Sequence, residues 1–387
     1  MDQPLGFVNS EFPNHAYHLH RSLYGLKQAP RAWFHRLSAF LLQLGFHFSK
    51  ADASLFIRHD NNSKLFVLVY VDDILVTGTS SALIDWFMTQ IQSIFPLRDL
   101  GELHFFLGME ILKLQNGMLL SQAKYIRDLL HKFNMADCKP CLTPMATSPT
   151  LTKLSGEPFQ DGELYRQLIG GLQYVTITRP DIAYSVNKLC QYMHSPTTSH
   201  WQALKRVLRY LQNSHQYGLF FSQNSTCEIQ CFSDSDWGGC PDDRRSTNGY
   251  VLYLGNNLVS WQTKKQPTIA RSSTESEYKS MANATAEIMW MQSLLSELGC
   301  SLPHPATLWC DNVGAIYLTA NPVFHARTKH IELDYHFVRE QIQLGRVRVK
   351  FISSADQIAD ILTKPLSCVP FDRHHSKLRL ISHAPSV

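Results

Sequence analysis

The sequence predicts an α/β (α+β) protein with more than one domain, and three observations support that prediction. An apolar hairpin pattern occupies residues 65–78, helical spacing of apolar residues follows in residues 157–226, and strand and helix patterns alternate from Cys227 onwards. A length of 387 residues leaves room for two or three domains, and a hydrophobic content of 44% is ample for packed cores.

The hairpin pattern is the most informative segment of the chain. Two apolar, β-branched runs of strand length flank Asp72 and Asp73, so the two carboxylates are expected at the tip of a hairpin. Aspartate also favours ordinary turns, but Gly, its usual turn partner, is missing here. Adjacent like charges repel each other unless a divalent cation lies between them and a polyanionic substrate. The segment therefore indicates polymerase chemistry.

Helical spacing surrounds this hairpin on both sides. Apolar residues at helical spacing precede the hairpin in the first region, which extends to about residue 140: Trp33, Leu37, Phe40, Leu41 and Leu44. A polar linker over residues 143–156 leads to a second region that is mostly helical and carries no evident chemistry. Two apolar helix faces are expected there, one with Leu164, Leu168 and Leu172 and one with Trp201, Leu204, Leu208 and Leu211.

The third region places carboxylates where its strands and helices begin or end. Asp234 lies in the first strand with Asp236 on the same face, and Asp311 ends the strand 306–310. Asp360 lies on a short terminal helix. Each of them alone is readily explained as a cap or a surface charge. Together they suit a two-metal phosphodiester hydrolase, in which one ion activates water and the other stabilises the leaving oxygen.

Glu277 is the fourth carboxylate of this set. It follows the capping hydroxyls of residues 272–274, and apolar residues continue from it at four-three spacing along one helix face: Met281, Ala284, Ile288, Met291, Leu295 and Leu298. A carboxylate on a buried face needs a partner, and a metal ion is the plausible one. Glu275 is displaced from this face, and we expect its replacement by Gln to be nearly silent.

Net charge and cysteine usage say less about the partners and the cellular compartment of the protein. A formal charge of +4 does not prove a nucleic-acid partner, and each basic cluster is also explained as a solvated face. The nine cysteines are scattered, and the CxxC spacing of Cys138 and Cys141 has no second pair at zinc-ribbon distance. No apolar run is long enough for a bilayer and no secretory leader is evident, so we expect a reducing cytoplasmic or nuclear compartment and no membrane.

At this point the chain closely resembles the C-terminal part of the Pol polyprotein of copia-type LTR retrotransposons, in which ribonuclease H follows reverse transcriptase. The resemblance covers nearly the whole chain. The motifs that carry it are Leu23-Tyr-Gly-Leu-Lys-Gln-Ala-Pro-Arg-Ala-Trp33, Tyr70-Val-Asp-Asp73, Asp99-Leu-Gly-Glu-Leu-His-Phe-Phe-Leu-Gly108, Arg179-Pro-Asp-Ile-Ala183, Asp243-Arg-Arg-Ser-Thr247, Ser273-Thr-Glu-Ser-Glu-Tyr278, Cys310-Asp-Asn312, Arg327-Thr-Lys-His-Ile331 and Ala359-Asp-Ile-Leu-Thr-Lys-Pro365.

The resemblance implies a domain organisation. Residues 1–142 would be a truncated reverse-transcriptase palm, residues 143–226 a linker with the helical thumb or connection, and residues 227–372 a ribonuclease H domain with a mixed sheet. Residues 373–387 would be a tail. The resemblance also implies that the protein is located in the cytoplasm, within virus-like particles, or in the nucleus. We further expect residues 227–370 to cleave hybrids when expressed alone.

The resemblance also implies roles for individual residues. The metal ligands for Mg²⁺ (Mn²⁺ possible) would be Asp72 and Asp73 in the palm, and Asp234, Glu277, Asp311 and Asp360 in the ribonuclease H domain. Asp356 lies one helical turn before Asp360 and competes for the fourth role; the family pattern favours Asp360. The partners would be an RNA–DNA hybrid and a primer–template, with template contacts from Lys27 and Gln28. Independently of the resemblance, we expect Arg245, Lys264 and Lys329 to contact phosphates, because a hybrid must be held near the carboxylates. His330 either assists proton transfer or product departure or has a structural role. A primer-gripping turn would lie near residues 106–108.

One feature of the palm departs from the family pattern. The third palm aspartate, expected on a strand before residues 27–30, is absent, and so are the fingers. Three interpretations remain open: an active ribonuclease H beside an inactive polymerase fragment, a nucleic-acid-binding remnant without turnover, and a decayed gene product that folds poorly.

Overall fold

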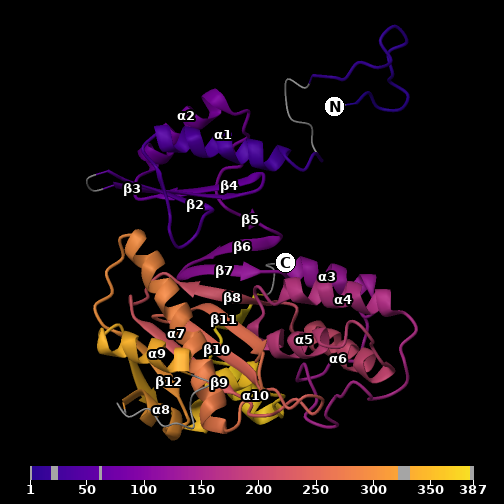
Figure 1. The fold of residues 1–387 in the computed structure, drawn as a ribbon, viewed down its shortest axis with the longest axis vertical. Coiled ribbons are helices and arrows are strands. Elements are labelled where there is room, and N and C mark those ends of the chain that lie inside the picture. Colours follow the sequence, from indigo (N-terminus) through magenta and orange to yellow (C-terminus); the bar gives the residue numbers. More distant parts are fainter. Residues whose placement is uncertain (1, 19–24, 61–62, 321–331, 384–387) are drawn as a thin grey trace. The chain divides into compact units, whose positions relative to one another are not determined.

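The computed structural model describes residues 2–18, 25–60, 63–320 and 332–383, and the chain divides into two compact units at Gly101 (Figure 1). The first unit has one sheet and one core and the second has two sheets and two cores, so each unit is described by itself. Within the described residues, no helix combines the length and the apolar content needed to cross a membrane.

The first unit is a four-stranded antiparallel meander with two helices on one face (Figure 1). Its elements in chain order are α1 (Ala29–Gln43), β1 (His47–Phe48), β2 (Leu55–Asp60), β3 (Ser63–Tyr70), β4 (Asp73–Gly78) and α2 (Ser81–Ile94). The expected helix and hairpin are therefore both present. Leu37 and Leu41 of α1 pack with Leu65 and Val67 of β3 and with Phe87 of α2, because alternate residues of β3 face the helices.

The second unit contains two five-stranded sheets and several helices. One sheet is antiparallel and runs in the order β14-β8-β7-β6-β5, from β14 (Leu380–Ser382), β8 (Tyr217–Ser222), β7 (Gly117–Ser121), β6 (Met109–Leu114) and β5 (Phe105–Phe106). The other is mixed and runs β11-β10-β9-β12-β13, from β11 (Asn257–Lys265), β10 (Thr247–Leu254), β9 (Ile229–Ser235), β12 (Ala306–Cys310) and β13 (Val347–Phe351).

The mixed sheet has the topology expected of a ribonuclease H-like domain. Its strands β9, β10 and β11 are antiparallel neighbours, whereas β12 runs parallel to β9 and β13 parallel to β12. The parallel strands are joined through helices, as a parallel connection requires. These helices are α7 (Ser273–Glu297), α8 (Val313–Ala320) and α9 (Glu332–Gln343).

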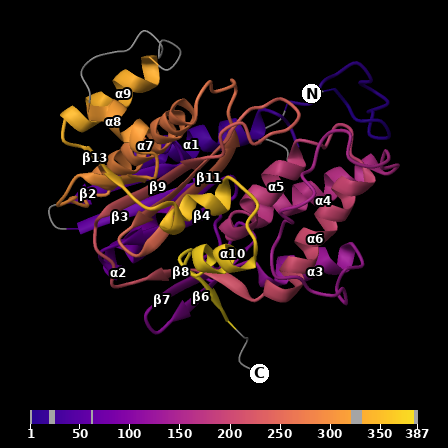
Figure 2. The same ribbon diagram turned by 90° about the horizontal axis from the view of Figure 1, so that it is seen from below.

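The helical second region packs against the opposite side of this sheet. It comprises α4 (Gly162–Val175), η1 (Pro180–Ile182), α5 (Ala183–Cys190) and α6 (Thr198–Ser214). Helix α3 (Ala123–Lys132), from the first region of the sequence, joins α4, α5 and α6 in one group in Figure 2. Leu168 of α4 and Leu204 of α6 belong to the same buried core as Val251 and Tyr253 of β10. A second core lies between the sheet and α7. The sheet is therefore covered on both faces.

Residues 373–383, which we assigned to a tail, contain the end of α10 (Cys368–His375) and strand β14. β14 pairs with β8 at the edge of the antiparallel sheet. The expected linker is also held in place, because Arg206 donates to the Thr143 carbonyl (3.1 Å) and Tyr192 to the Leu151 carbonyl (2.9 Å). The expectation that residues 227–370 act alone must be revised, since their sheet shares a core with the helices before them.

Candidate active site

The hairpin of the first unit presents its aspartates to solvent. Tyr70 pairs with Asp73, so Val71 and Asp72 form a two-residue turn between β3 and β4. Val71 has a φ of 51°, a left-handed conformation that is costly for a β-branched residue. Both aspartates are exposed. A strained turn that carries two exposed carboxylates is typical of a functional site rather than of a stabilising one.

In the second unit, the fold gathers four carboxylates at one edge of the mixed sheet. Asp234 lies near the end of β9 and Asp311 directly follows β12, and these parallel neighbours end at the same edge. Glu277 lies in the second turn of α7, whose first residue is preceded by the capping side chain of Ser272. Asp360 lies in the short helix η4 (Ile358–Leu362), which packs on β9 and β10.

Few protein groups satisfy these carboxylates. The Ser235 N–H donates to Glu277 Oε1 at 3.3 Å, while Glu277 Oε2 is buried without a hydrogen-bond partner. Ser354 Oγ donates to Asp311 Oδ2 at 2.7 Å, and Thr363 Oγ1 donates to Asp234 Oδ2. One oxygen each of Glu277 and Asp311 lies with Cys310 Sγ in a group whose members are within 4.8 Å of one another.

Burial and mutual repulsion both act on the protons of this site. Burial, followed by the charges of Asp234 and Asp311, raises the pKa of Glu277 to about 10. Burial and then Asp234 raise the pKa of Asp360 to about 7. Burial also raises the pKa of the Cys310 thiol, so the thiol stays protonated and the carboxylates are the available metal ligands.

The donor set fits divalent metal ions of the magnesium type. Such ions prefer carboxylate oxygens, and the unpartnered Glu277 Oε2 is a buried acceptor that a cation would satisfy. The same cation would reverse the repulsion that raises these pKa values. Asp234, Glu277, Asp311 and Asp360 would hold the ions.

The contacts separate the two candidates for the fourth carboxylate. Asp356 has 58% of its side chain exposed and binds Ser353 and Lys377. Asp360 is 7% exposed and faces Asp234. The structure therefore brings Asp360, and not Asp356, to Asp234.

Asp236 and Glu275 are two further carboxylates near the end of β9 and the start of α7. Asp236 follows the end of β9 and accepts a hydrogen bond from the Thr247 N–H, which gives it a structural role in the turn; burial raises its pKa to about 7. Glu275 is 8% exposed, accepts from the Arg271 N–H at 2.8 Å and pairs with Lys279 at 2.9 Å. The expectation that Glu275→Gln is nearly silent for cleavage stays a prediction, but Glu275 is buried in the first turn of α7 and is not displaced to an exposed face.

The expected nucleic-acid contacts are dispersed. Lys27 and Gln28 are exposed just before α1, and Lys264 is exposed on β11. Arg245 is partly engaged by Asp243 at 3.8 Å. Lys329 and His330 lie outside the described residues. The turn at residues 107–108 joins β5 to β6 with positive φ at both positions, and the Leu107 carbonyl accepts a hydrogen bond from Tyr174.

Sequence reasoning missed two neighbours of the carboxylates, Thr363 and Lys364. Lys364 Nζ lies 2.9 Å from Asp360 Oδ1 and 3.9 Å from Asp234 Oδ2. Burial alone would lower the pKa of Lys364, but Asp234 and Asp360 outweigh it and raise the pKa, so the amine stays charged. Its position four residues after Asp360 was the available signal, since that spacing brings side chains together in a helical turn.

A hairpin that carries paired aspartates, followed by a ribonuclease H-like mixed sheet with acidic residues at one edge, is the arrangement of a retroelement Pol region. Comparison with known proteins agrees. The family model for reverse transcriptase (RNA-dependent DNA polymerase) matches residues 1–147. The chain belongs to the family of copia-type retrotransposon Pol polyproteins.

The curated relatives are much longer than this chain. A retrovirus-related Pol polyprotein from transposon RE2 of Arabidopsis thaliana is 50% identical over 386 residues, which cover 100% of this chain and 26% of that protein. The polyprotein from transposon TNT 1-94 of Nicotiana tabacum is 34% identical over 374 residues, covering 94% of this chain and 28% of that protein. The chain thus spans about a quarter of their length.

Solved ribonuclease H structures are more distant. The RNase H1 of Halobacterium salinarum is 14% identical, with 35% of this chain and 94% of that chain covered at a TM-score of 0.27. The strand order described above, and not this similarity, supports the topology.

Proposed function

We propose that the four-carboxylate cluster is the active site of a ribonuclease H that hydrolyses the RNA strand of an RNA–DNA hybrid. The observation that supports this most is the convergence of four carboxylates from separate elements, with Glu277 Oε2 buried and unpartnered. Two Mg²⁺ or Mn²⁺ ions, when bound, would activate a water molecule and stabilise the leaving oxygen. The assignment of residues 1–142, 143–226 and 227–372 to palm, connection and ribonuclease H segments is part of the proposal, as a division of the sequence; the structure divides the chain into compact units at Gly101.

The residues around the cluster would keep the carboxylates in place. Thr363 and Ser354 donate to Asp234 and Asp311, which restricts the rotation of both side chains. The Ser235 N–H does the same for Glu277. Donors held in fixed positions before substrate binds need no rearrangement during the reaction.

For the first unit we propose that Asp72 and Asp73 hold metal ions for nucleotide addition in a reverse-transcriptase palm. Their exposure on a strained turn leaves them accessible to a primer terminus. Lys27 and Gln28 are proposed to contact the template. The activity belongs to the longer polyprotein, in the cytoplasm or nucleus, and other segments of it would complete the polymerase.

A cleavage assay on the full chain tests the nuclease. An RNA strand labelled at one end is annealed to DNA and incubated with protein and Mg²⁺ or Mn²⁺. We expect cleavage of this hybrid, no cleavage of duplex DNA or single-stranded RNA, and no cleavage in EDTA. Asp234→Asn and Asp311→Asn should each slow cleavage by on the order of a thousandfold, the cost of several kcal/mol of lost transition-state stabilisation.

Asp356→Asn is the matched control, because Asp356 is an exposed aspartate on the same segment as Asp360. It should cleave at the wild-type rate, whereas Asp360→Asn should not. Loss of cleavage in Asp356→Asn would overturn the assignment of Asp360 as the fourth ligand. Binding of hybrid without any cleavage would instead support a binding remnant, and affinity that is independent of salt would rule out phosphate contacts by Arg245 and Lys264.

A further inference from the structure

Lys364 is a cation placed inside the acidic site. Its ammonium lies 2.9 Å from Asp360 Oδ1 and 3.9 Å from Asp234 Oδ2, so it bridges two of the four carboxylates. Glu277 and Asp311 have no comparable cation at salt-bridge distance among the described residues. The ammonium therefore makes ion pairs with Asp234 and Asp360 only, although its charge also acts on Glu277 and Asp311.

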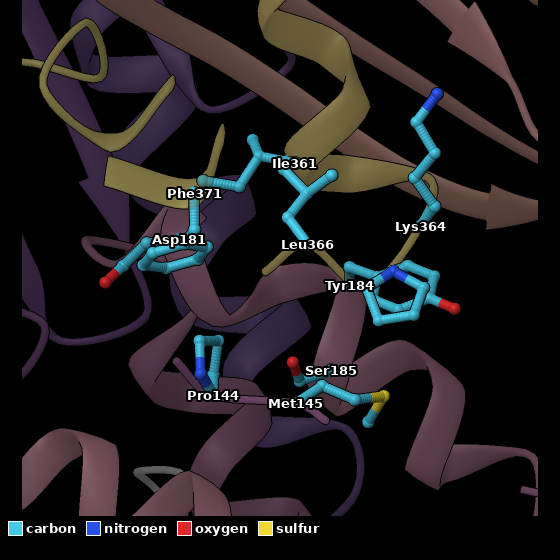
Figure 3. A pocket seen from close by; sticks show the side chains of 10 residues that line it. Pro144, Met145, Asp181, Tyr184, Ser185, Ile361, Lys364, Leu366 and Phe371 are labelled. Atoms are coloured by element: carbon cyan, nitrogen blue, oxygen red, sulfur yellow. The ribbon is translucent and has the colours of Figure 1, made fainter. Parts of the chain in front are cut away.

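The stem of Lys364 leaves this ammonium room to move. The residue lies at the rim of a small cavity between α5 and residues 361–371, and Figure 3 shows the amine pointing away from Ile361 and Leu366. The side chain is 41% exposed. A lysine stem has four rotatable bonds, so the ammonium can exchange its carboxylate contacts for water without any backbone change.

The ammonium and a divalent metal ion would compete for the same carboxylates. Without any cation, Asp234 and Asp360 would repel each other at close range in a partly buried site. An ammonium at salt-bridge distance from both offsets that repulsion. A divalent ion that binds the same two carboxylates would be repelled by the ammonium at this distance, so both cannot hold these positions together.

We propose that Lys364 is an exchangeable counter-ion of the acidic site, which holds Asp234 and Asp360 together before metal binds and would leave when a divalent ion binds these carboxylates. The inference rests on the metal site of the proposed function, although it does not require that the site hydrolyse RNA. Lys364 is a positioning residue in this scheme, since its effect on chemistry acts through the carboxylates.

Metal binding measured without substrate tests the proposal. The full chain is freed of metal with EDTA, and Mn²⁺ binding is followed by calorimetry and by the shift in melting temperature. Lys364→Met should lower the half-saturating Mn²⁺ concentration about tenfold, because a competitor that occupies the site about nine-tenths of the time reduces apparent affinity by that factor. It should also lower the melting temperature of the metal-free protein by about 2–4 °C.

Lys377→Met is the matched control. Lys377 is similarly exposed, at 36%, and pairs with Asp356 at 3.4 Å on the neighbouring segment, away from the cluster. Its replacement should leave Mn²⁺ affinity within about twofold of wild type, the scale of a surface pair. Lys364→Arg should retain the wild-type affinity, and in an Asp360→Asn background Lys364→Met should change the affinity little.

Unchanged or weaker Mn²⁺ binding in Lys364→Met would overturn the proposal. Lys364→Gln provides a second variant if the methionine protein does not unfold cooperatively. Failure of the proposed function would look different. If Lys364→Met binds Mn²⁺ more tightly than the wild type but neither protein cleaves a hybrid, the counter-ion role of Lys364 is supported and the nuclease function is contradicted.

Discussion

Two buried charged sites in the second unit differ in how their charges are satisfied. Arg179 and Asp181 are both fully buried, and Arg179 donates two hydrogen bonds to Asp181 (3.0 and 2.7 Å) and two to Ser214 (2.6 and 2.8 Å). Tyr210 adds a hydrogen bond to Asp181 at 2.6 Å. The acidic site has four carboxylates, one ammonium and an unpartnered Glu277 oxygen.

The protonation of the two sites follows from this difference. Burial by itself would raise the pKa of Asp181, but the Arg179 guanidinium outweighs it and the pKa is lowered. In the acidic site burial and like charges act in the same direction, and the pKa of Glu277 rises to about 10. Charges that the protein pairs completely contribute to the structure, whereas charges left unpaired are ready for an external cation.

Separating the acidic site from the Arg179–Asp181 site by truncation should have the largest effect on stability. A fragment of residues 227–370 removes Arg179, Asp181 and the helices that cover Val251 and Tyr253. We expect it to lose cooperative unfolding, whereas residues 102–387, which form one compact unit, should retain it. Thermal unfolding followed by near-ultraviolet circular dichroism measures this. Equal melting temperatures for the two fragments would show that the shared core is dispensable.

Breaking the Arg179–Asp181 ion pair should give the next largest loss of stability. Arg179→Met leaves Asp181 charged and buried, so the free energy of unfolding should fall by about 3–5 kcal/mol, as measured by urea denaturation of the full chain. Arg179→Met with Asp181→Leu should recover much of that loss, because no unpaired charge remains. A single change that costs under about 1 kcal/mol would contradict the structural role of the pair.

Removing a carboxylate from the acidic site should increase the free energy of unfolding, whereas breaking the Arg179–Asp181 pair should decrease it. Glu277→Gln should stabilise the metal-free protein by about 1–3 kcal/mol, because the amide is neutral and folding no longer requires protonation of a buried carboxylate. The same variant should lose cleavage of the hybrid. Denaturation in EDTA and in Mg²⁺ measures the first effect, and a gain that persists in Mg²⁺ would argue against a metal at Glu277.

Expressed per pH unit, the pH dependence of the metal-free protein is the smallest expected effect. Raised pKa values of Glu277 (about 10) and Asp360 (about 7) mean that the folded state binds more protons than the unfolded state at neutral pH. Stability should therefore fall as pH rises from 6.5 to 8, by up to about 1.4 kcal/mol per pH unit for each proton. Glu277→Gln should reduce that slope, and a slope equal to wild type would contradict the assignment.

The sequence by itself determined the local features that depend on periodicity. The strands around Asp72 and Asp73, the position of Asp311 after β12 and the buried stripe from Glu277 along α7 follow from alternation and from three-four spacing. The family could be identified from ordered motifs in the same way. None of these inferences requires knowledge of residues distant in the chain.

Only the tertiary structure decided which charges meet. Asp360 and Asp356 are equivalent by spacing, yet only Asp360 faces Asp234, because η4 packs on β9 and β10 while Asp356 points to solvent. Glu275 is buried by its neighbours, and Lys364 reaches Asp234 across more than a hundred residues. The desolvation and repulsion that give a carboxylate its function depend on distances in space, and local periodicity carries no information about them.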